Sequence, residues 1–188
     1  MKKIILLIIV NIFLSCNAQE YPLRTYGIEF PKDSYLKDTT NELSQYEGVW
    51  KATWSNKTIF ITLKKIKYYK DFLDSRAYYA DILIGKFKVS DNNGNILFDN
   101  TNIIDDKAKI KGTNFGKSDN KYSLFYIDRD LCGITGDIII NFIDSAKTKL
   151  QWIYSKDTNW IDTDCFYYDK PASERPDPLP YNIIFTKQ

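Results

Sequence analysis

Apolar and polar side chains alternate at a period of two residues through most of the chain beyond residue 43. In the first such segment, Trp50, Ala52 and Trp54 share one face, with Lys51 and Thr53 opposite. Successive side chains of a β-strand point to opposite faces, so this period is typical of strands with one buried face. No long segment shows the 3.6-residue period of a helix. The pattern therefore predicts an all-β fold and argues against parallel βαβ units.

Turn residues divide the alternating segments into about eight or nine strands, the spacing of a β-barrel or sandwich. The strongest turn signal is residues 92–95, where Gly94 can supply a positive φ. A second hairpin is predicted between residues 137–143 and 149–154. We predict one antiparallel meander, most simply closed as a barrel, with a β-sandwich as the alternative.

One segment changes phase. Ile59, Ile61 and Leu63 share a face, whereas Ile66 and Tyr68 continue the alternation one residue out of step. An extra residue in a strand shifts the alternation in this way. The pattern therefore predicts a β-bulge at residues 64–65.

The N-terminus has the pattern of an export signal. Two lysines precede a short apolar run, and the residues that follow it include Cys16 and Ala18. The sequence at residues 13–16 resembles a bacterial lipobox, in which Cys16 would be lipidated; the alternative is ordinary cleavage after Ala18. This predicts a signal peptide at 1–18, a tether or strap at 19–42 and a β domain at 43–188. The expected location is the outer membrane, facing the periplasm, or the soluble periplasm or medium if cleavage follows Ala18.

The charge balance limits the possible partners. The whole chain has 26 basic and 24 acidic side chains. Two of the basic residues, Lys2 and Lys3, leave with the signal, so the mature domain is formally neutral. A neutral domain lacks the excess positive charge with which proteins bind nucleic acid. The expected membrane contact is the N-terminal lipid alone.

The chain has no histidine. This excludes Ser-His and Cys-His catalytic pairs and histidine-ligated metals. No phosphate-binding glycine loop is present, and we expect no cofactor. The remaining candidates for catalysis or calcium binding are loop carboxylates, namely Asp128, Asp130, Asp157, Asp162, Asp164 and Asp169. They lack the spacing of a calcium loop, and solvated acidic loops are their ordinary explanation. We therefore expect no enzyme and no metal site, and a carboxylate-dependent hydrolase is the least favoured function.

Two cysteines remain in the predicted mature domain. Cys132 precedes the 137–143 strand, and Cys165 follows the 149–154 strand, so both lie at the same end of one predicted hairpin. Export would place them in an oxidising compartment. The arrangement predicts a disulfide between them, with two free buried thiols as the alternative.

The segment Gly48-Val49-Trp50 resembles the Gly-x-Trp motif of lipocalin-type barrels, in which the tryptophan closes one barrel end. The arginine that packs on it from the last strand in that family has no match here, and Trp50 can equally be an ordinary core residue. The resemblance implies a barrel interior that takes an apolar small ligand. The candidate ligand-binding residues are Trp50, Trp54, Phe87 and Trp152.

A second resemblance extends over nearly all of the predicted mature chain. It rests on the following segments: Tyr21-Pro22-Leu23, Ser34-Tyr35-Leu36-Lys37-Asp38, Tyr46-x-Gly48-x-Trp50-Lys51, Cys132-Gly133, Cys165, Leu179-Pro180 and the final Phe185-Thr186-Lys187-Gln188. In this order they resemble an uncharacterised flavobacterial family of exported proteins, a domain of unknown function. The resemblance implies export and no particular activity. We expect a non-catalytic binding module; the alternative is a structural or protein-interaction component of the cell envelope.

Overall fold

The computed structural model describes residues 19–71, 76–157, 161–171 and 174–188. Cys16 and the predicted signal peptide lie outside the described residues. The strands are β1 (Glu20–Pro22), β2 (Tyr35–Lys37), β3 (Gly48–Trp54), β4 (Lys57–Lys70), β5 (Tyr78–Asp91), β6 (Ile96–Asp99), β7 (Ile110–Phe115), β8 (Tyr122–Asp128), β9 (Ile134–Phe142), β10 (Lys149–Lys156) and β11 (Asn182–Lys187). The described residues also form the 3₁₀ turns η1 (Leu43–Tyr46), η2 (Asp105–Lys107) and η3 (Arg129–Leu131). Within the described ranges, no helix has the length and apolar character needed to cross a bilayer.

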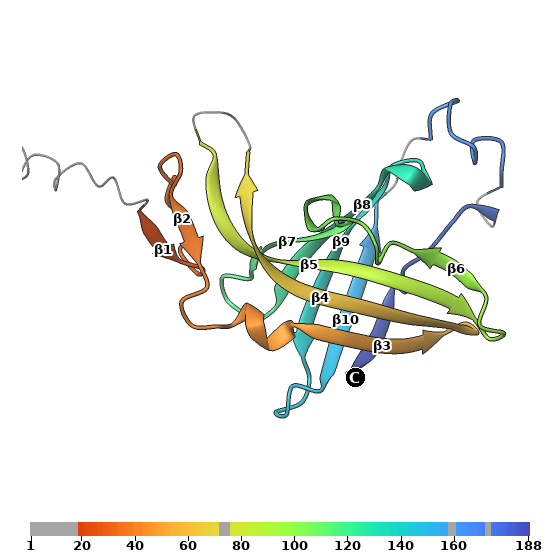
Figure 1. The fold of residues 1–188 in the computed structure, drawn as a ribbon, viewed down its shortest axis with the longest axis horizontal. Helices are drawn as coiled ribbons and strands as arrows, with labels where there is room; N and C mark the ends of the chain where they lie inside the picture. The colour runs from red at the N-terminus through yellow and green to blue at the C-terminus, as the bar shows by residue number, and fades with distance from the viewer. Residues whose placement is uncertain (1–18, 72–75, 158–160, 172–173) are drawn as a thin grey trace, which may run out of the picture.

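Eight strands close into an antiparallel β-barrel (Figure 1). The order around the barrel is β3, β4, β5, β7, β8, β9, β10 and β11, and β11 returns to β3. The closing contacts pair Thr186 with Lys51, and Gly85 with Ile110. This confirms the predicted antiparallel meander and its closure. A β-sandwich is excluded, because its two sheets would stay separate.

Strand β5 has three partners along one edge. It pairs with β2 at residues 79–80, with β7 at 84–85 and with β6 at 88–90. Strands β4 and β5 continue beyond the barrel, and the parallel strands β1 and β2 extend their sheet there (Figure 1). The β5–β6 turn confirms the predicted hairpin, with Gly94 at φ +83°. The sequence pattern did not predict β1 and β2.

The predicted bulge at residues 64–65 is wrong. Every residue of β4 pairs with β5 without a register shift. The alternation changes because the surroundings of the two faces change where β4 leaves the barrel. Leu63 points into the barrel, but Lys65 on the same face meets Asp38 and Ser44. On the opposite face, Ile66 becomes half-buried against the core.

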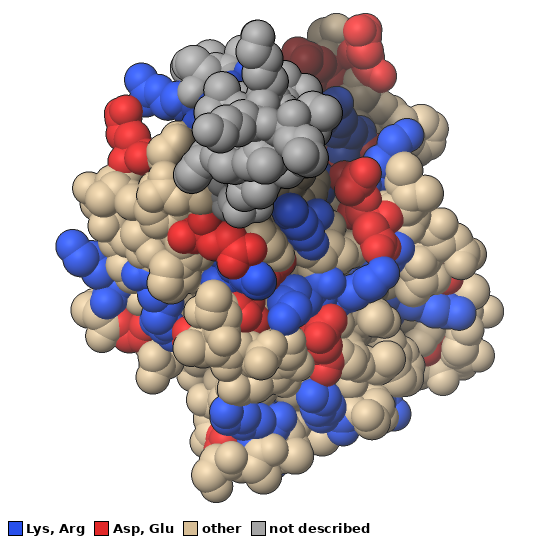
Figure 2. Space-filling model, turned by 60° about the vertical axis from the view of Figure 1, so that its left-hand side comes forward, with Lys and Arg blue, Asp and Glu red and all other residues tan. Residues whose placement is uncertain are grey.

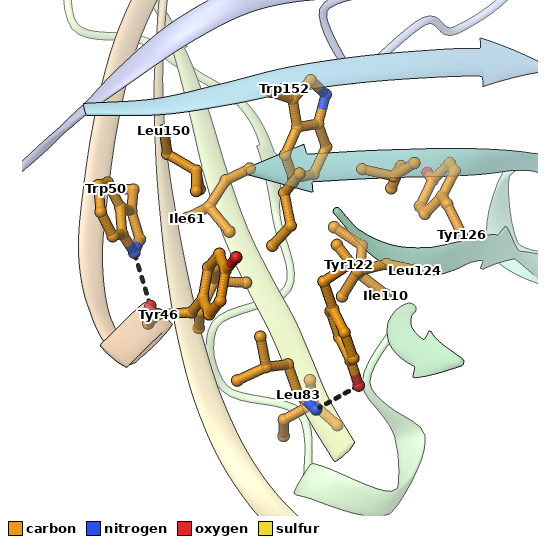
Figure 3. Close-up of a cluster of buried hydrophobic side chains, with 14 of the residues drawn as sticks. Tyr46, Trp50, Ile61, Leu83, Ile110, Tyr122, Leu124, Tyr126, Leu150 and Trp152 are labelled. Carbon is orange, nitrogen blue, oxygen red and sulfur yellow. Dashed lines mark hydrogen bonds between the residues drawn. The ribbon is translucent and has the colours of Figure 1, made fainter. Parts of the chain in front are cut away.

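Large side chains from many strands fill the barrel interior (Figure 3). The largest fully buried ones include Trp50, Trp152, Tyr122, Tyr126 and Phe87. Tyr122 crosses the interior, and its hydroxyl accepts a hydrogen bond from the Leu83 backbone N–H at 3.4 Å. The ring passes directly over Gly112, where a Cβ atom would lie 2.1 Å from the hydroxyl oxygen. Close packing of this kind specifies one arrangement of the core.

Two buried carboxylates hold the 19–42 segment against the barrel. Asp81 of β5 accepts hydrogen bonds from the Tyr35 hydroxyl at 2.6 Å and from the Asp38 backbone N–H at 2.9 Å. Asp38 in turn accepts from the backbone N–H groups of Glu42 and Leu43, at 2.8 and 3.0 Å, and so starts η1. Charge-assisted hydrogen bonds of this kind are among the stronger ones in proteins. They position η1 at one end of the barrel.

Basic and acidic side chains are interspersed on the surface. Figure 2 shows Lys and Arg side by side with Asp and Glu across the displayed face. Several are paired, for example Lys64 with Asp105 and Lys37 with Glu20. Exposed pairs of this kind contribute little to stability individually.

Candidate ligand-binding site

A pocket of about 510 Å³ lies at the barrel end that carries η1. We call it the end pocket. Four segments far apart in the sequence form it: the 19–42 segment, η1, the β7–β8 loop and the β9–β10 hairpin. Its lining residues include Arg24, Glu42, Tyr46, Phe115, Phe142 and Lys147. Pockets of roughly 300–1,000 Å³ are typical of small-molecule sites.

Aromatic rings form the apolar part of the end pocket. Tyr46 and Phe142 are stacked, with ring centroids 4.2 Å apart and an interplanar angle of 22°. Phe115 lies 6.4 Å from Tyr46, and the buried Trp50 lies 6.1 Å from Phe142. The Trp50 indole N–H donates to the Tyr46 carbonyl at 2.8 Å, which fixes η1 over the barrel (Figure 3). The rings therefore sit on a rigid base.

Arg24 lies along the rim of the end pocket. Its guanidinium stacks 4.1 Å from the centroid of the Phe115 ring and forms an ion pair with Glu42 at 2.7 Å. It also donates to the Asn120 side-chain oxygen at 3.2 Å. The hydrogen bond from Arg24 lowers the pKa of Glu42, so both groups are charged at neutral pH. Arg24 thus ties the 19–42 segment to the β7–β8 loop.

Lys147 occupies another side of the rim, in the β9–β10 turn. It adopts a left-handed conformation with φ 57°, and Asp144 closes the turn by accepting from Thr148. The ammonium group lies 5.8 Å from the Phe142 ring centroid and donates to the Gln45 side-chain oxygen. Within the described part of the chain, Lys147 has no carboxylate partner.

Tyr46 is one of the lining residues, and its side chain carries a hydroxyl. This hydroxyl makes no hydrogen bond to any residue in the described ranges. Burial raises the pKa of Tyr46 to about 12, so the hydroxyl is protonated at neutral pH. A protonated phenol can donate a hydrogen bond. The end pocket therefore combines stacked rings with a neutral donor, the Tyr46 hydroxyl, and with charged donors that include Lys147.

The four residues predicted to bind ligand do not form one site. Trp50, Phe87 and Trp152 are buried in the barrel, whereas Trp54 is half-buried at the far end of β3, with Lys57 over its ring. No ring contact joins any two of them among the described residues. Trp50 alone approaches the end pocket, behind Phe142. Whether these residues bind a ligand remains a prediction.

The opposite end of the barrel carries the disulfide. Cys132 follows η3, and Cys165 lies in the segment after β10; the two are bonded, with their Cα atoms 5.6 Å apart. This confirms the predicted pairing. The bond anchors the long connection between β10 and β11 to the end of β8.

Three of the six loop aspartates, Asp128, Asp130 and Asp157, are engaged with neighbouring side chains, whereas Asp162, Asp164 and Asp169 are exposed. Lys109 bonds both Asp128 and Asp130, and the Tyr126 hydroxyl donates to Asp128 at 3.1 Å. Asp157 accepts from the Thr135 hydroxyl at 2.7 Å. In the part of the chain that the structure describes, no three His, Cys, Asp or Glu side chains group as a metal site would require.

The fold and this site together define the class: a closed antiparallel β-barrel with an amphipathic pocket at one end. The sequence model of a family of unknown function (DUF6705) matches residues 1–188, and the chain belongs to that family. No curated protein and no solved structure matches the chain.

Proposed function

We propose that this protein is a non-catalytic binding module that holds an apolar small ligand in the end pocket. The observation that carries the proposal is the stacked Tyr46 and Phe142 pair, which forms the base of a 510 Å³ pocket. Concave sites lined by aromatic rings with a few polar groups are the usual form of small-molecule sites. A ligand seated there covers the apolar face that the stacked rings present.

The end pocket is a better candidate than the middle of the barrel. Trp50, Phe87 and Trp152 are each at most 1% exposed, so a ligand among them would have to displace close-packed side chains. Trp50 still contributes from behind Phe142, as a fixed wall. Its indole also makes it a fluorescence reporter for changes at the site.

A fluorescent apolar probe tests this proposal. N-phenyl-1-naphthylamine brightens on transfer from water to an apolar site. We expect it to bind the purified protein and to bind Phe142→Ala about tenfold more weakly, because the variant loses much of a stacked aromatic surface. Phe60→Ala, which removes an exposed ring on the outer face of β4, is the matched control and is expected to bind normally. Equal binding by both variants would contradict the proposed site.

The chemistry of the side chains supports a role without catalysis. The chain has no histidine, and the buried carboxylate of Asp128 is engaged with Lys109 and Tyr126. A general base or nucleophile needs a partner that tunes its proton affinity and a substrate within reach. The lysine and phenol around Asp128 hold it as part of a structural network.

We also propose that the chain is exported and attached to the outer membrane through lipid on Cys16. The basic and apolar pattern of residues 1–18 supports export, and so does a disulfide, which persists in oxidising compartments. Radiolabelled palmitate should enter the wild type and Ser15→Ala, but not Cys16→Ala. Labelling of Cys16→Ala to the same extent as the wild type would contradict the proposal.

A protein-interaction role in the envelope is the second candidate. Ile139 and Ile153 lie opposite each other on the outer face of β9 and β10, and Ile184 of β11 lies on the same face. All three are at least 36% exposed. Native mass spectrometry of the protein purified from its own host separates the candidates: a retained small molecule supports the binding module, and a retained polypeptide supports the interaction role.

A further inference from the structure

We propose that the end pocket selects a ligand with a flat apolar body and a single anionic group, and that Lys147 binds the anion. This inference rests on the proposed binding function and adds the chemical class of the ligand. Three observations carry it: the charges around the rim, the position of Lys147 over the rings, and the unpartnered Tyr46 hydroxyl.

Within the described part of the chain, one of the cations on the rim has no anionic partner. Arg24 is neutralised by Glu42 at 2.7 Å, and the Lys121 ammonium lies 3.8 Å from the Asp119 carboxylate. Among the described residues, the only acceptor for Lys147 is the neutral side-chain oxygen of Gln45. The lining therefore carries one net positive charge, which a single anionic group on the ligand would balance.

Lys147 is placed to use that charge. Its ammonium lies 5.8 Å from the Phe142 ring centroid, so a ligand packed against the half-buried Phe142 would bring an attached anion close to the ammonium. An ammonium has three N–H donors, and the hydrogen bond to Gln45 occupies one of them. The others remain for an acceptor on the ligand. Charge-assisted hydrogen bonds beside an apolar surface are stronger than those in open water.

The Tyr46 hydroxyl adds a second donor in the same pocket. No residue in the described ranges accepts from it, and burial raises its pKa to about 12, so it is protonated at neutral pH. A carboxylate or sulfonate has enough acceptor sites for both groups. A second anion on the ligand would face the carboxylates of Glu42 and Asp119, which also line the pocket. This favours one anionic group over two.

Two fluorescent probes that differ only in charge test the inference. 1-Anilinonaphthalene-8-sulfonate carries one sulfonate, and N-phenyl-1-naphthylamine is the same anilinonaphthalene body without it. We expect the wild type to bind the sulfonate probe more tightly. Lys147→Gln should lower the affinity for the sulfonate probe about tenfold, which is the effect expected from losing one hydrogen bond to a charged group. The affinity of this variant for the neutral probe should stay within about twofold of the wild-type value. Tyr46→Phe should weaken the sulfonate probe by a smaller factor.

The matched control is Lys57→Gln. Lys57 also lies over an aromatic ring, with its Nζ 5.7 Å from the Trp54 ring centroid, but it is outside the end pocket. Both probes should bind this variant as they bind the wild type, and circular dichroism should show that all the variants are folded. The inference is overturned if Lys147→Gln binds the sulfonate probe normally, or if both probes weaken equally. Failure of both probes to bind the wild type would instead refute the binding function itself.

Discussion

Lys187 of the last strand lies over the indole ring of Trp50 in the first barrel strand, with 5.3 Å between its Nζ and the ring centroid. The two residues also pair in register across the seam between β11 and β3. The resemblance to lipocalin-type barrels implies an arginine at this place. Here a lysine supplies the cation, and its ammonium also donates to the Gln45 carbonyl at 3.3 Å. One side chain thus joins the seam to η1.

The Trp50 indole should matter more to stability than the cation above it. Trp50→Phe leaves the buried Tyr46 carbonyl without its donor and opens space in the core, with an expected loss of about 2–3 kcal/mol in the free energy of unfolding. Lys187→Met keeps an apolar side chain of similar length and should lower the free energy of unfolding by about 0.5–1 kcal/mol. Urea denaturation followed by circular dichroism measures both. Trp54→Phe, at a half-buried position, is the control; a Lys187→Met loss as large as that of Trp50→Phe would contradict this ranking.

The disulfide should be a major contributor to stability. Cys132 and Cys165 are 33 residues apart, and closing a loop of that size is worth about 3–4 kcal/mol in the chain-entropy model. Cys132→Ser/Cys165→Ser should lose about that much free energy of unfolding. In a Cys16→Ala background, intact mass after alkylation should show two modified thiols only when the unfolded protein is first reduced. Two alkylated thiols without reductant would refute the bond.

Gly112 should not tolerate even a methyl group. A Cβ there would lie 2.1 Å from the hydroxyl oxygen of Tyr122 and 2.8 Å from its ring, and the ring is fully buried. We expect Gly112→Ala to lower the free energy of unfolding by about 2–3 kcal/mol, because the added methyl group overpacks the core. Thr113→Ala, at the exposed neighbouring position, should stay within about 1 kcal/mol of the wild type. Thermal unfolding compares the two, and equal melting temperatures would show that Tyr122 can move aside.

The Arg24–Glu42 pair should stabilise the fold at neutral but not at acidic pH. Its hydrogen bond lowers the folded-state pKa of Glu42 below the ordinary value of 4.5. A lowered carboxyl pKa adds stability above that ordinary value, and the gain disappears as the pH falls through the folded pKa. Glu42→Gln should therefore lower the free energy of unfolding by about 0.5–1 kcal/mol at pH 7, and by progressively less below pH 4.5.

A double-mutant cycle provides the control for that pair. In an Arg24→Gln background, Glu42→Gln should cost much less at pH 7, because the partner is already absent. Urea midpoints at several pH values measure the difference. A cost that is the same at pH 3 and pH 7 would show that the Glu42 charge is not responsible.

Strands that line the barrel were predictable because one face meets the core and the other meets water. The alternation of β3 and the hairpin of β9 and β10 follow that rule throughout. The rule failed where surroundings change along one strand, as at Ile66, which is half-buried on a face that lies outside the barrel. It also missed β1 and β2, since three residues are too few to show a period.

The disulfide was predictable from the hairpin geometry, but the end pocket was not. Tyr46 and Phe142 have the pattern of ordinary core residues, and Arg24 lies in a polar segment without periodicity. The pocket arises when Lys147 reaches Gln45, 102 residues away in the chain, and no local pattern encodes that contact. Aromatic residues at the last inward position of a barrel strand, such as Phe142, are the available signal.

The pairing of β3 with β11 also determines when the barrel can close during synthesis of the chain. Strand β3 leaves the ribosome early, but its partner is the final six-residue strand of the chain. Until β11 emerges, β3 keeps an unpaired edge, and such edges are where nascent chains associate wrongly. Joining chain segments so far apart carries a large entropy cost, so the seam should close last. A message truncated just before β11 would therefore yield a chain whose barrel stays open.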